Sequence, residues 1–125
     1  MSLGHVIPMF RMFDEDKAKE FYLDYLDFRL DWEHRFEDDL PLYMQVSKDH
    51  FILHLTEHHG DCSPGSAVRI AIEELEELHQ VLLGKKYKNL RSGIEVTEWD
   101  TKEMCLLDPF GNKLIFYEEI YNSLK

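Results

Sequence analysis

The feature that most constrains this fold is one order of elements that occurs twice within 125 residues. Each half begins with a short apolar stretch typical of a strand, continues with apolar residues at helical spacing, and ends with further strand-like stretches. A half of about 60 residues is too short to bury a stable core by itself. We therefore expect one domain over residues 1–125, built from a first module at about residues 4–62 and a second at about 63–120.

The first half contains one helix signal set among strand signals. Asp14 is typical of a helix N-cap, and the apolar residues after it recur at helical spacing until about Asp27. Strands are predicted for residues 5–13, 28–36, 42–47 and 51–57. Alternation within the second of these strands predicts one shared face for Phe28, Leu30, Trp32, His34 and Phe36.

The second half repeats this order after a linker at residues 58–65, which is dense in residues that interrupt helices and strands. A helix is predicted for residues 73–86, with Leu75, Leu78, Val81 and Leu82 on its apolar face. Strands are predicted for residues 67–72, 94–99, 103–107 and 113–119, and a tight turn for 108–112. We expect residues 120–125 to be mobile or weakly docked.

Together the two halves predict an α+β protein. Two tandem βαβββ modules placed side by side would form an open, cup-shaped mixed sheet with the helices outside. Side chains along each strand would then alternate between a helix-packed face and the open face. The alternation of residues 51–57 places His54 on the open face, opposite Leu53 and Leu55.

Charge and composition exclude several classes of function. Lys and Arg number 14 against 25 Asp and Glu, so the net charge is −11, which disfavours nucleic acid and anionic membrane surfaces and favours a cationic partner. No apolar stretch reaches the ~20 residues of a membrane span, and no signal-peptide pattern is present, so we expect a cytoplasmic protein. The two cysteines, Cys62 and Cys105, are too few for a disulfide scaffold, and we expect Cys105 in the core.

Two segments of the chain resemble the glyoxalase/bleomycin-resistance superfamily, also called the vicinal-oxygen-chelate superfamily. They are residues 18–28 (AKEFYLDYLDF) and residues 108–116 (DPFGNKLIF), and the resemblance extends over about residues 5–119. Residues 53–61 (LHLTEHHGD), and Trp99 just before the seventh strand, resemble the bleomycin-resistance branch. Asp100 is a departure, because that branch usually has glycine after this tryptophan.

The resemblance also implies which positions of this chain correspond to the metal-ligand positions of the superfamily's enzymes, which bind a divalent metal ion. The four ligand positions correspond here to His5, His54, Arg69 and Ile115. Isoleucine cannot ligate a metal, and arginine is permanently cationic and would repel one. We therefore expect no metal, no other cofactor and no catalytic residues. A metal-dependent glyoxalase-like lyase or dioxygenase using His5 and His54 remains the alternative.

Without a metal, the resources of such a cup are its aromatic rings and its negative charge. The candidate ligand-binding residues are Trp32, Phe36, Tyr43, His54 and Trp99. Flat rings stack on planar groups and attract cations, although the alternation of Trp32 and Phe36 suits a core position equally well. The resemblance implies a homodimer that sequesters bleomycin-like antibiotics and confers resistance without catalysis. Binding of an endogenous metabolite remains open, as does the role of the His58–His59 linker.

Overall fold

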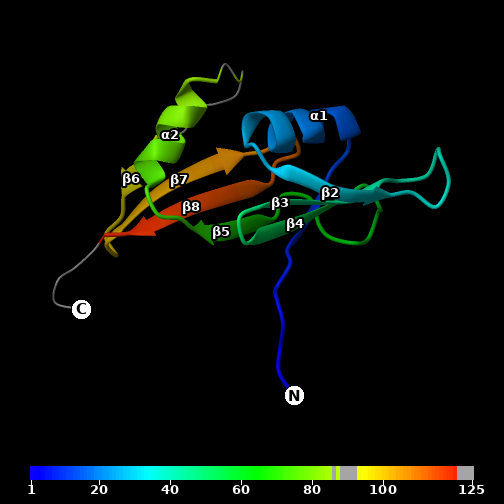
Figure 1. Ribbon diagram of the computed structural model, residues 1–125, viewed down its shortest axis with the longest axis horizontal. Helices are drawn as coiled ribbons and strands as arrows, with labels where there is room; N and C mark the ends of the chain where they lie inside the picture. Colours follow the sequence, from blue (N-terminus) through cyan, green and yellow to red (C-terminus); the bar gives the residue numbers. More distant parts are fainter. Residues whose placement is uncertain (86, 88–92, 121–125) are drawn as a thin grey trace. The chain divides into compact units, whose positions relative to one another are not determined.

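The computed structural model describes residues 1–85, 87 and 93–120 (Figure 1). The first half contains β1 (Met9–Arg11), α1 (Glu15–Lys19), the π-helical turn η1 (Glu20–Tyr25), β2 (Arg29–His34), β3 (Tyr43–Lys48) and β4 (Phe51–Thr56). The second half contains β5 (Ala67–Ala71), α2 (Leu75–Leu83), β6 (Glu95–Val96), β7 (Thr101–Leu107) and β8 (Lys113–Glu119). The predicted order of strand, helix and three strands is therefore present in both halves.

The strands of the described residues form two four-stranded mixed sheets, in the orders β1-β4-β3-β2 and β5-β8-β7-β6. In each sheet the first strand of the half runs parallel to the last, and the other pairs are antiparallel. The predicted α+β class is confirmed. The division into modules stays a prediction, and no helix among the described residues is long and apolar enough to cross a membrane.

The chain forms two compact units, and their boundaries do not follow the chain order strictly. The first unit comprises residues Met1–Ser66 together with Asp108–Asn112, and the second comprises the described residues of Ala67–Leu107 and of Lys113–Lys125. The turn between β7 and β8 thus belongs by its contacts to the first unit.

The helical segment of the first unit begins where the sequence predicts. The side chain of Asp14 accepts a hydrogen bond from the Lys17 backbone nitrogen at 2.9 Å, as an N-cap does. The segment ends at Tyr25, and Asp27 adopts a left-handed backbone conformation with φ of 59°. Its apolar face lies on the first sheet, where it buries Ala18, Phe21, Tyr22, Tyr25 and Leu26 over Phe10, Met44, Val46, Leu53 and Leu55.

A β-bulge in β2 overturns the face predicted for its side chains. Leu30 pairs with Val46, but the pairing then shifts and Trp32 pairs with Gln45. Since Val46 is buried under the helix and Gln45 is not, Leu30 and Trp32 lie on opposite faces. The extra residue of a bulge breaks the two-residue period, so Trp32 faces outward with 43% of its surface exposed.

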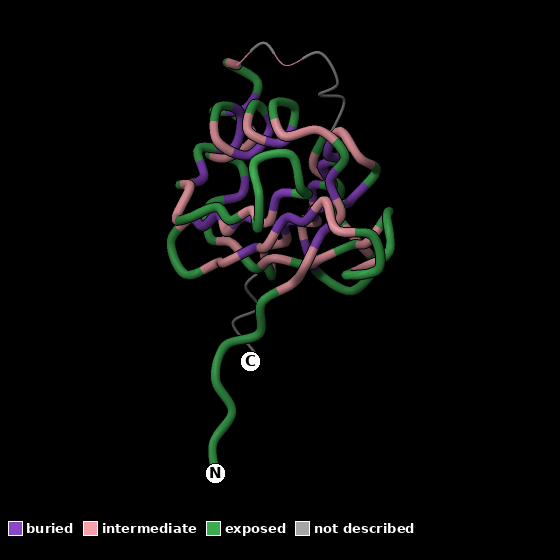
Figure 2. The backbone as a smooth tube through the Cα atoms, turned by 90° about the vertical axis from the view of Figure 1, so that its right-hand side faces the viewer, coloured by how far each residue is buried: buried purple, intermediate pink, exposed green. Residues whose placement is uncertain are grey.

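The first strand is shorter than predicted. Only Met9, Phe10 and Arg11 pair with β4, and the Pro8 carbonyl accepts one further bond from the His54 nitrogen. Proline has no N–H to extend the ladder, so residues 5–8 do not continue the strand. His5 therefore lies outside β1, in an exposed N-terminal segment that Figure 2 shows in green.

The turn of residues 108–112 is held by a buried network in the first unit. Asp108 accepts hydrogen bonds from the Tyr22 hydroxyl at 2.7 Å and from the backbone nitrogens of Phe110 and Asn112 at 2.8 Å. The Asn112 amide donates to Asp108 and to the Arg11 carbonyl. The DPFGN motif is therefore a packing device of the first unit as well as a hairpin turn.

In the second unit, α2 begins later than predicted, at Leu75. Glu118 of β8 accepts hydrogen bonds from the backbone nitrogens of Glu74 and Leu75, and Glu74 has a left-handed φ of 60°. A carboxylate from another strand thus caps this helix. Leu75 and Leu82 are buried as predicted, whereas Val81 is 51% exposed. The predicted helix end at residue 86, and residues 121–125 of the predicted tail, lie outside the described residues.

Two further predictions for the second unit are wrong. The strand expected at residues 94–99 shrinks to the two residues of β6, and Trp99 lies in the turn before β7. Asp100 adopts a left-handed φ of 61° there, a conformation that aspartate tolerates better than most residues. Cys105 is exposed, because alternation along β7 turns Met104 and Leu106 inward instead.

Candidate functional site

The face of the first sheet turned away from α1 carries a group of aromatic rings, which we call the aromatic platform: Trp32, Tyr43 and His54. The Trp32 and Tyr43 rings stack almost parallel, with centroids 5.9 Å apart and an interplanar angle of 8°. The His54 ring lies edge-on to both, at 5.4 Å from Trp32 and 5.1 Å from Tyr43. Three neighbouring strands, β2, β3 and β4, thus bring together three of the predicted ligand-binding residues.

Hydrogen bonds link the platform into one connected row. The Tyr43 hydroxyl lies 2.6 Å from His54 Nδ1, and His54 Nε2 lies 2.9 Å from Gln45 Oε1. Gln45 Nε2 donates to Asp31 Oδ2 at 3.0 Å, and Arg29 Nε donates to Asp31 Oδ1 at 2.9 Å. The row runs through the bulge, because the bulge turns Asp31 toward Gln45.

The environment keeps the histidine and the tyrosine of the platform neutral. Burial lowers the pKa of His54 below the ordinary histidine value. Burial and the neighbouring Asp61 carboxylate raise the pKa of Tyr43. Hydrogen bonds from Gln45, Ser47 and Arg29 lower the pKa of Asp31 to about 2, so this carboxylate is ionised at neutral pH.

Phe36 lies at the margin of the platform. It follows the end of β2, is 74% exposed, and contacts His34 at 5.0 Å and His58 at 6.5 Å between ring centroids. His58 in turn lies 6.5 Å from the Tyr43 ring. His58 of the linker therefore connects Phe36 to the platform through ring contacts.

The linker that carries His58 is held against the end of β4 by one buried side chain. The Thr56 hydroxyl donates to Asp61 at 2.9 Å and accepts from the His58 backbone nitrogen at 3.0 Å. Thr56 is fully buried, so these bonds are protected from water. They bring the negative charge of Asp61 toward the platform side of the first unit.

Trp99 belongs to the second unit and has a different setting. It is 64% exposed, and its indole nitrogen donates to Glu103 at 3.2 Å. Glu103 also accepts two bonds from Arg69, at 2.8 and 3.3 Å, and Arg69 lies 4.6 Å from the centroid of the Tyr117 ring. The Arg69 guanidinium lowers the pKa of Glu103 to about 2. Trp99 is thus anchored at its indole nitrogen while most of its surface is exposed.

The residues at the metal-ligand positions do not fit a metal ion. His54 uses both ring nitrogens, toward Tyr43 and Gln45, and His5 lies outside the strand that should position it. Arg69 and Ile115 are neighbours in register across β5 and β8, and neither can donate an electron pair to a cation. No three His, Cys, Asp or Glu side chains in residues 1–85, 87 and 93–120 group in a way that could hold a metal.

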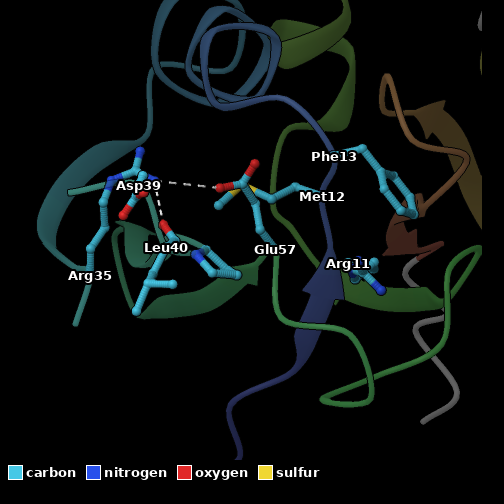
Figure 3. A pocket seen from close by; sticks show the side chains of 8 residues that line it. Arg11, Met12, Phe13, Arg35, Asp39, Leu40 and Glu57 are labelled. Carbon is cyan, nitrogen blue, oxygen red and sulfur yellow. Dashed lines mark hydrogen bonds and ion pairs between the residues drawn. The ribbon is translucent and has the colours of Figure 1, made fainter. Parts of the chain in front are cut away.

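The first unit also contains a polar cavity of about 430 Å³ at the ends of β1 and β4. Figure 3 shows Arg35 and Glu57 directed toward one another beside it, 3.8 Å apart. Arg35 also donates to the Leu40 carbonyl, and Glu57 accepts from the Leu42 nitrogen. These groups are satisfied by one another, and none of the predicted ligand-binding residues lines this cavity.

Sequence reasoning missed Asp31, Gln45 and Glu103, which orient the predicted aromatic residues. Asp31 and Gln45 alternate with apolar neighbours and have the pattern of ordinary solvent-facing strand residues. The close sequence spacing of Trp99 and Glu103 was the one available signal for the third. The partner of Gln45 depends on strand register, which the sequence pattern does not predict.

Comparisons with known proteins agree on the family and the fold. A family model described as "Glyoxalase superfamily protein" matches residues 1–123. No curated protein matches the chain. Among solved structures, the bleomycin-binding protein of Streptomyces verticillus, crystallised with copper(II)-bleomycin, is 18% identical with a TM-score of 0.70, over 98% of this chain and 99% of that chain.

Two further solved structures are similar. TnmS3, an antibiotic binding protein from Streptomyces sp. CB03234, is 19% identical with a TM-score of 0.73, over 95% of this chain and 98% of that chain. A glyoxalase family protein from Enterococcus faecalis is 16% identical with a TM-score of 0.66, over 94% of this chain and 97% of that chain. At such identities the likeness establishes the fold and leaves the ligand to the residues of the site.

Proposed function

The chain belongs to the glyoxalase superfamily, and from that premise we propose that it binds a planar, cationic small molecule without transforming it. The proposed ligands are antibiotics of the bleomycin kind, sequestered one for one, so that the protein confers resistance. The single observation that carries the proposal is the aromatic platform, where Trp32 stacks on Tyr43 and leaves 43% of its surface open.

The platform suits a flat ligand for energetic reasons. One aromatic pair contributes about 0.5–1.5 kcal/mol beyond the burial of its area, and a cation over an indole adds about 0.5–2 kcal/mol. Trp32 is held in place by Tyr43 and His54, so little ordering is needed when a ligand stacks on it. The exposed ring of Trp99, fixed at its nitrogen by Glu103, is a second stacking surface of the same kind.

Charge supports a cationic ligand. The net charge of −11 raises the local concentration of cations around the protein. Two acidic side chains, Asp31 and Asp61, belong to the surroundings of the platform itself. Binding that relies on this field should weaken as salt is added.

The chemistry of the donor groups favours binding over metal-dependent catalysis. His54, the one metal-position residue on the platform, is committed to Tyr43 and Gln45 by hydrogen bonds at both nitrogens. Solved relatives that bind antibiotics, including a bleomycin-binding protein, share the fold. By the same likeness we propose a homodimer, with stacking residues contributed by both subunits.

Calorimetric titration with metal-free bleomycin tests the proposal directly. We expect binding at micromolar concentration, and a loss of about tenfold or more in Trp32→Ala and in Trp99→Ala, since each removes a stacking ring. Val81→Ala is the matched control, because Val81 is an exposed apolar residue of α2 that is not among the proposed stacking residues. Absence of heat and of fluorescence quenching at micromolar drug would refute the antibiotic assignment. Light scattering in the same buffer reports the proposed dimer.

A further inference from the structure

The hydrogen-bond row that connects the platform to Asp31 has a fixed direction, and Asp31 sets this direction. This carboxylate can only accept hydrogen bonds, because hydrogen bonds from its neighbours hold it in the ionised form. The Gln45 side chain must therefore turn its NH₂ group toward Asp31 Oδ2, 3.0 Å away. The carbonyl oxygen of the same amide is left facing His54.

The orientation of Gln45 determines which nitrogen of His54 carries the proton. Gln45 Oε1 is an acceptor 2.9 Å from His54 Nε2, so this nitrogen must be the N–H of the neutral ring. His54 Nδ1 then presents a lone pair. Its neighbour at 2.6 Å, the Tyr43 hydroxyl, must donate to it.

The consequence appears at the Tyr43 end of the row. The single proton of the Tyr43 hydroxyl is used by His54, so the phenolic oxygen has only lone pairs left for a ligand. Reversing the row would turn the Gln45 carbonyl oxygen against the Asp31 carboxylate, two acceptors without a proton between them. The arrangement is therefore locked by the charge of Asp31, which two intervening side chains, Gln45 and His54, connect to the tyrosine.

We propose that Tyr43 selects ligands whose planar group presents an N–H donor, and that Gln45 and Asp31 act as positioning residues for this selection. This inference rests on the proposed function and narrows its ligand class to flat cations with amino, amidinium or protonated ring N–H groups. A quaternary cation of the same shape would stack on Trp32, but it has no N–H to donate to the Tyr43 oxygen.

The first experiment measures the direction of the row without any ligand. In the ¹⁵N-labelled protein at neutral pH, we expect His54 Nε2 to have the chemical shift of a protonated ring nitrogen and Nδ1 that of an unprotonated one. The His54 signal is identified by its loss in His54→Asn. A protonated Nδ1 in the unliganded protein would overturn the inference, whatever the protein binds.

The second experiment compares two planar cations of the same charge and ring system. 9-Aminoacridinium carries N–H donors, and 10-methylacridinium has none. We expect the first to bind about tenfold or more tightly than the second, as a hydrogen bond from a charged donor does. Tyr43→Phe should abolish the preference, because the phenyl ring has no oxygen that accepts the N–H of 9-aminoacridinium.

Controls separate this inference from the proposed function. Tyr117→Phe, the same substitution in the second unit, should leave the preference intact, and Gln45→Met should reduce it by freeing His54 to exchange protons between its nitrogens. Equal binding of both acridinium ions to the unmodified protein would overturn the donor rule while the platform stands. Binding of neither ion would count against the proposed function, and the ¹⁵N measurement would then decide the inference alone.

Discussion

Replacing Asp108 removes the acceptor of four hydrogen bonds at the turn of residues 108–112. Oδ1 accepts from the backbone nitrogens of Phe110 and Asn112, and Oδ2 accepts from the Tyr22 hydroxyl and the Asn112 side-chain amide. The carboxyl is buried, and burial raises its pKa, so the bonds offset a real cost of burying the charge. The network should therefore be worth less than the sum of its bonds.

The magnitudes follow from how many donors each substitution leaves unpaired. A net hydrogen bond contributes about 1 kcal/mol, so Tyr22→Phe, which removes one donor, should cost about 1 kcal/mol of unfolding free energy. Asp108→Asn keeps one accepting oxygen and should cost about 2 kcal/mol. Asp108→Ala leaves all four donors without an acceptor and should cost about 3 kcal/mol after allowing for the relieved burial of charge.

Urea denaturation followed by circular dichroism measures this series. Asp38→Asn, in an exposed turn, is the matched control and should change stability by less than about 0.5 kcal/mol. The slope of the transition should stay constant, because the substitutions act on the folded state. If Asp108→Ala costs no more than the control, or less than Tyr22→Phe, the turn does not hold the first unit together as described.

Two further predictions concern the turns of the second half. Arg69 is the main cause that lowers the pKa of Glu103 to about 2, so the anchoring of Trp99 should be complete above the ordinary glutamate pKa and lost as the pH falls toward 2. In Trp32→Phe, which leaves Trp99 as the only tryptophan, the fluorescence should stay constant from neutral pH to about 5. A transition centred near pH 5 would contradict the ion pair. Gly111 has a φ of 86°, and no atom lies within 4 Å of a Cβ added there, so Gly111→Ala should lower the free energy of unfolding by about 1 kcal/mol through backbone strain alone. Gly93 is equally uncrowded and has no positive φ, so Gly93→Ala is the control and should cause no measurable loss. Urea denaturation measures both variants.

Features that depend on residues close together in the chain could be predicted from the sequence. The N-cap at Asp14 and the turn of residues 108–112 depend on residues close together in the chain, and both are where the sequence predicts them. The outward direction of His54 follows from two-residue alternation, which holds in β4 because that strand pairs without irregularity. The order of elements in the two halves likewise needs only hydrophobic periodicity.

Features that depend on contacts between distant parts of the chain could not be predicted from the alternation of apolar and polar residues. The bulge in β2 moved Trp32 to the open face, and its pairing with Gln45 depends on register across β3. The start of α2 depends on Glu118, 43 residues further along the chain than Leu75. The sequence therefore supplies the aromatic candidates, whose role in ligand binding stays a prediction. The direction of the hydrogen bonds arises only when three strands place Asp31, Gln45 and His54 side by side.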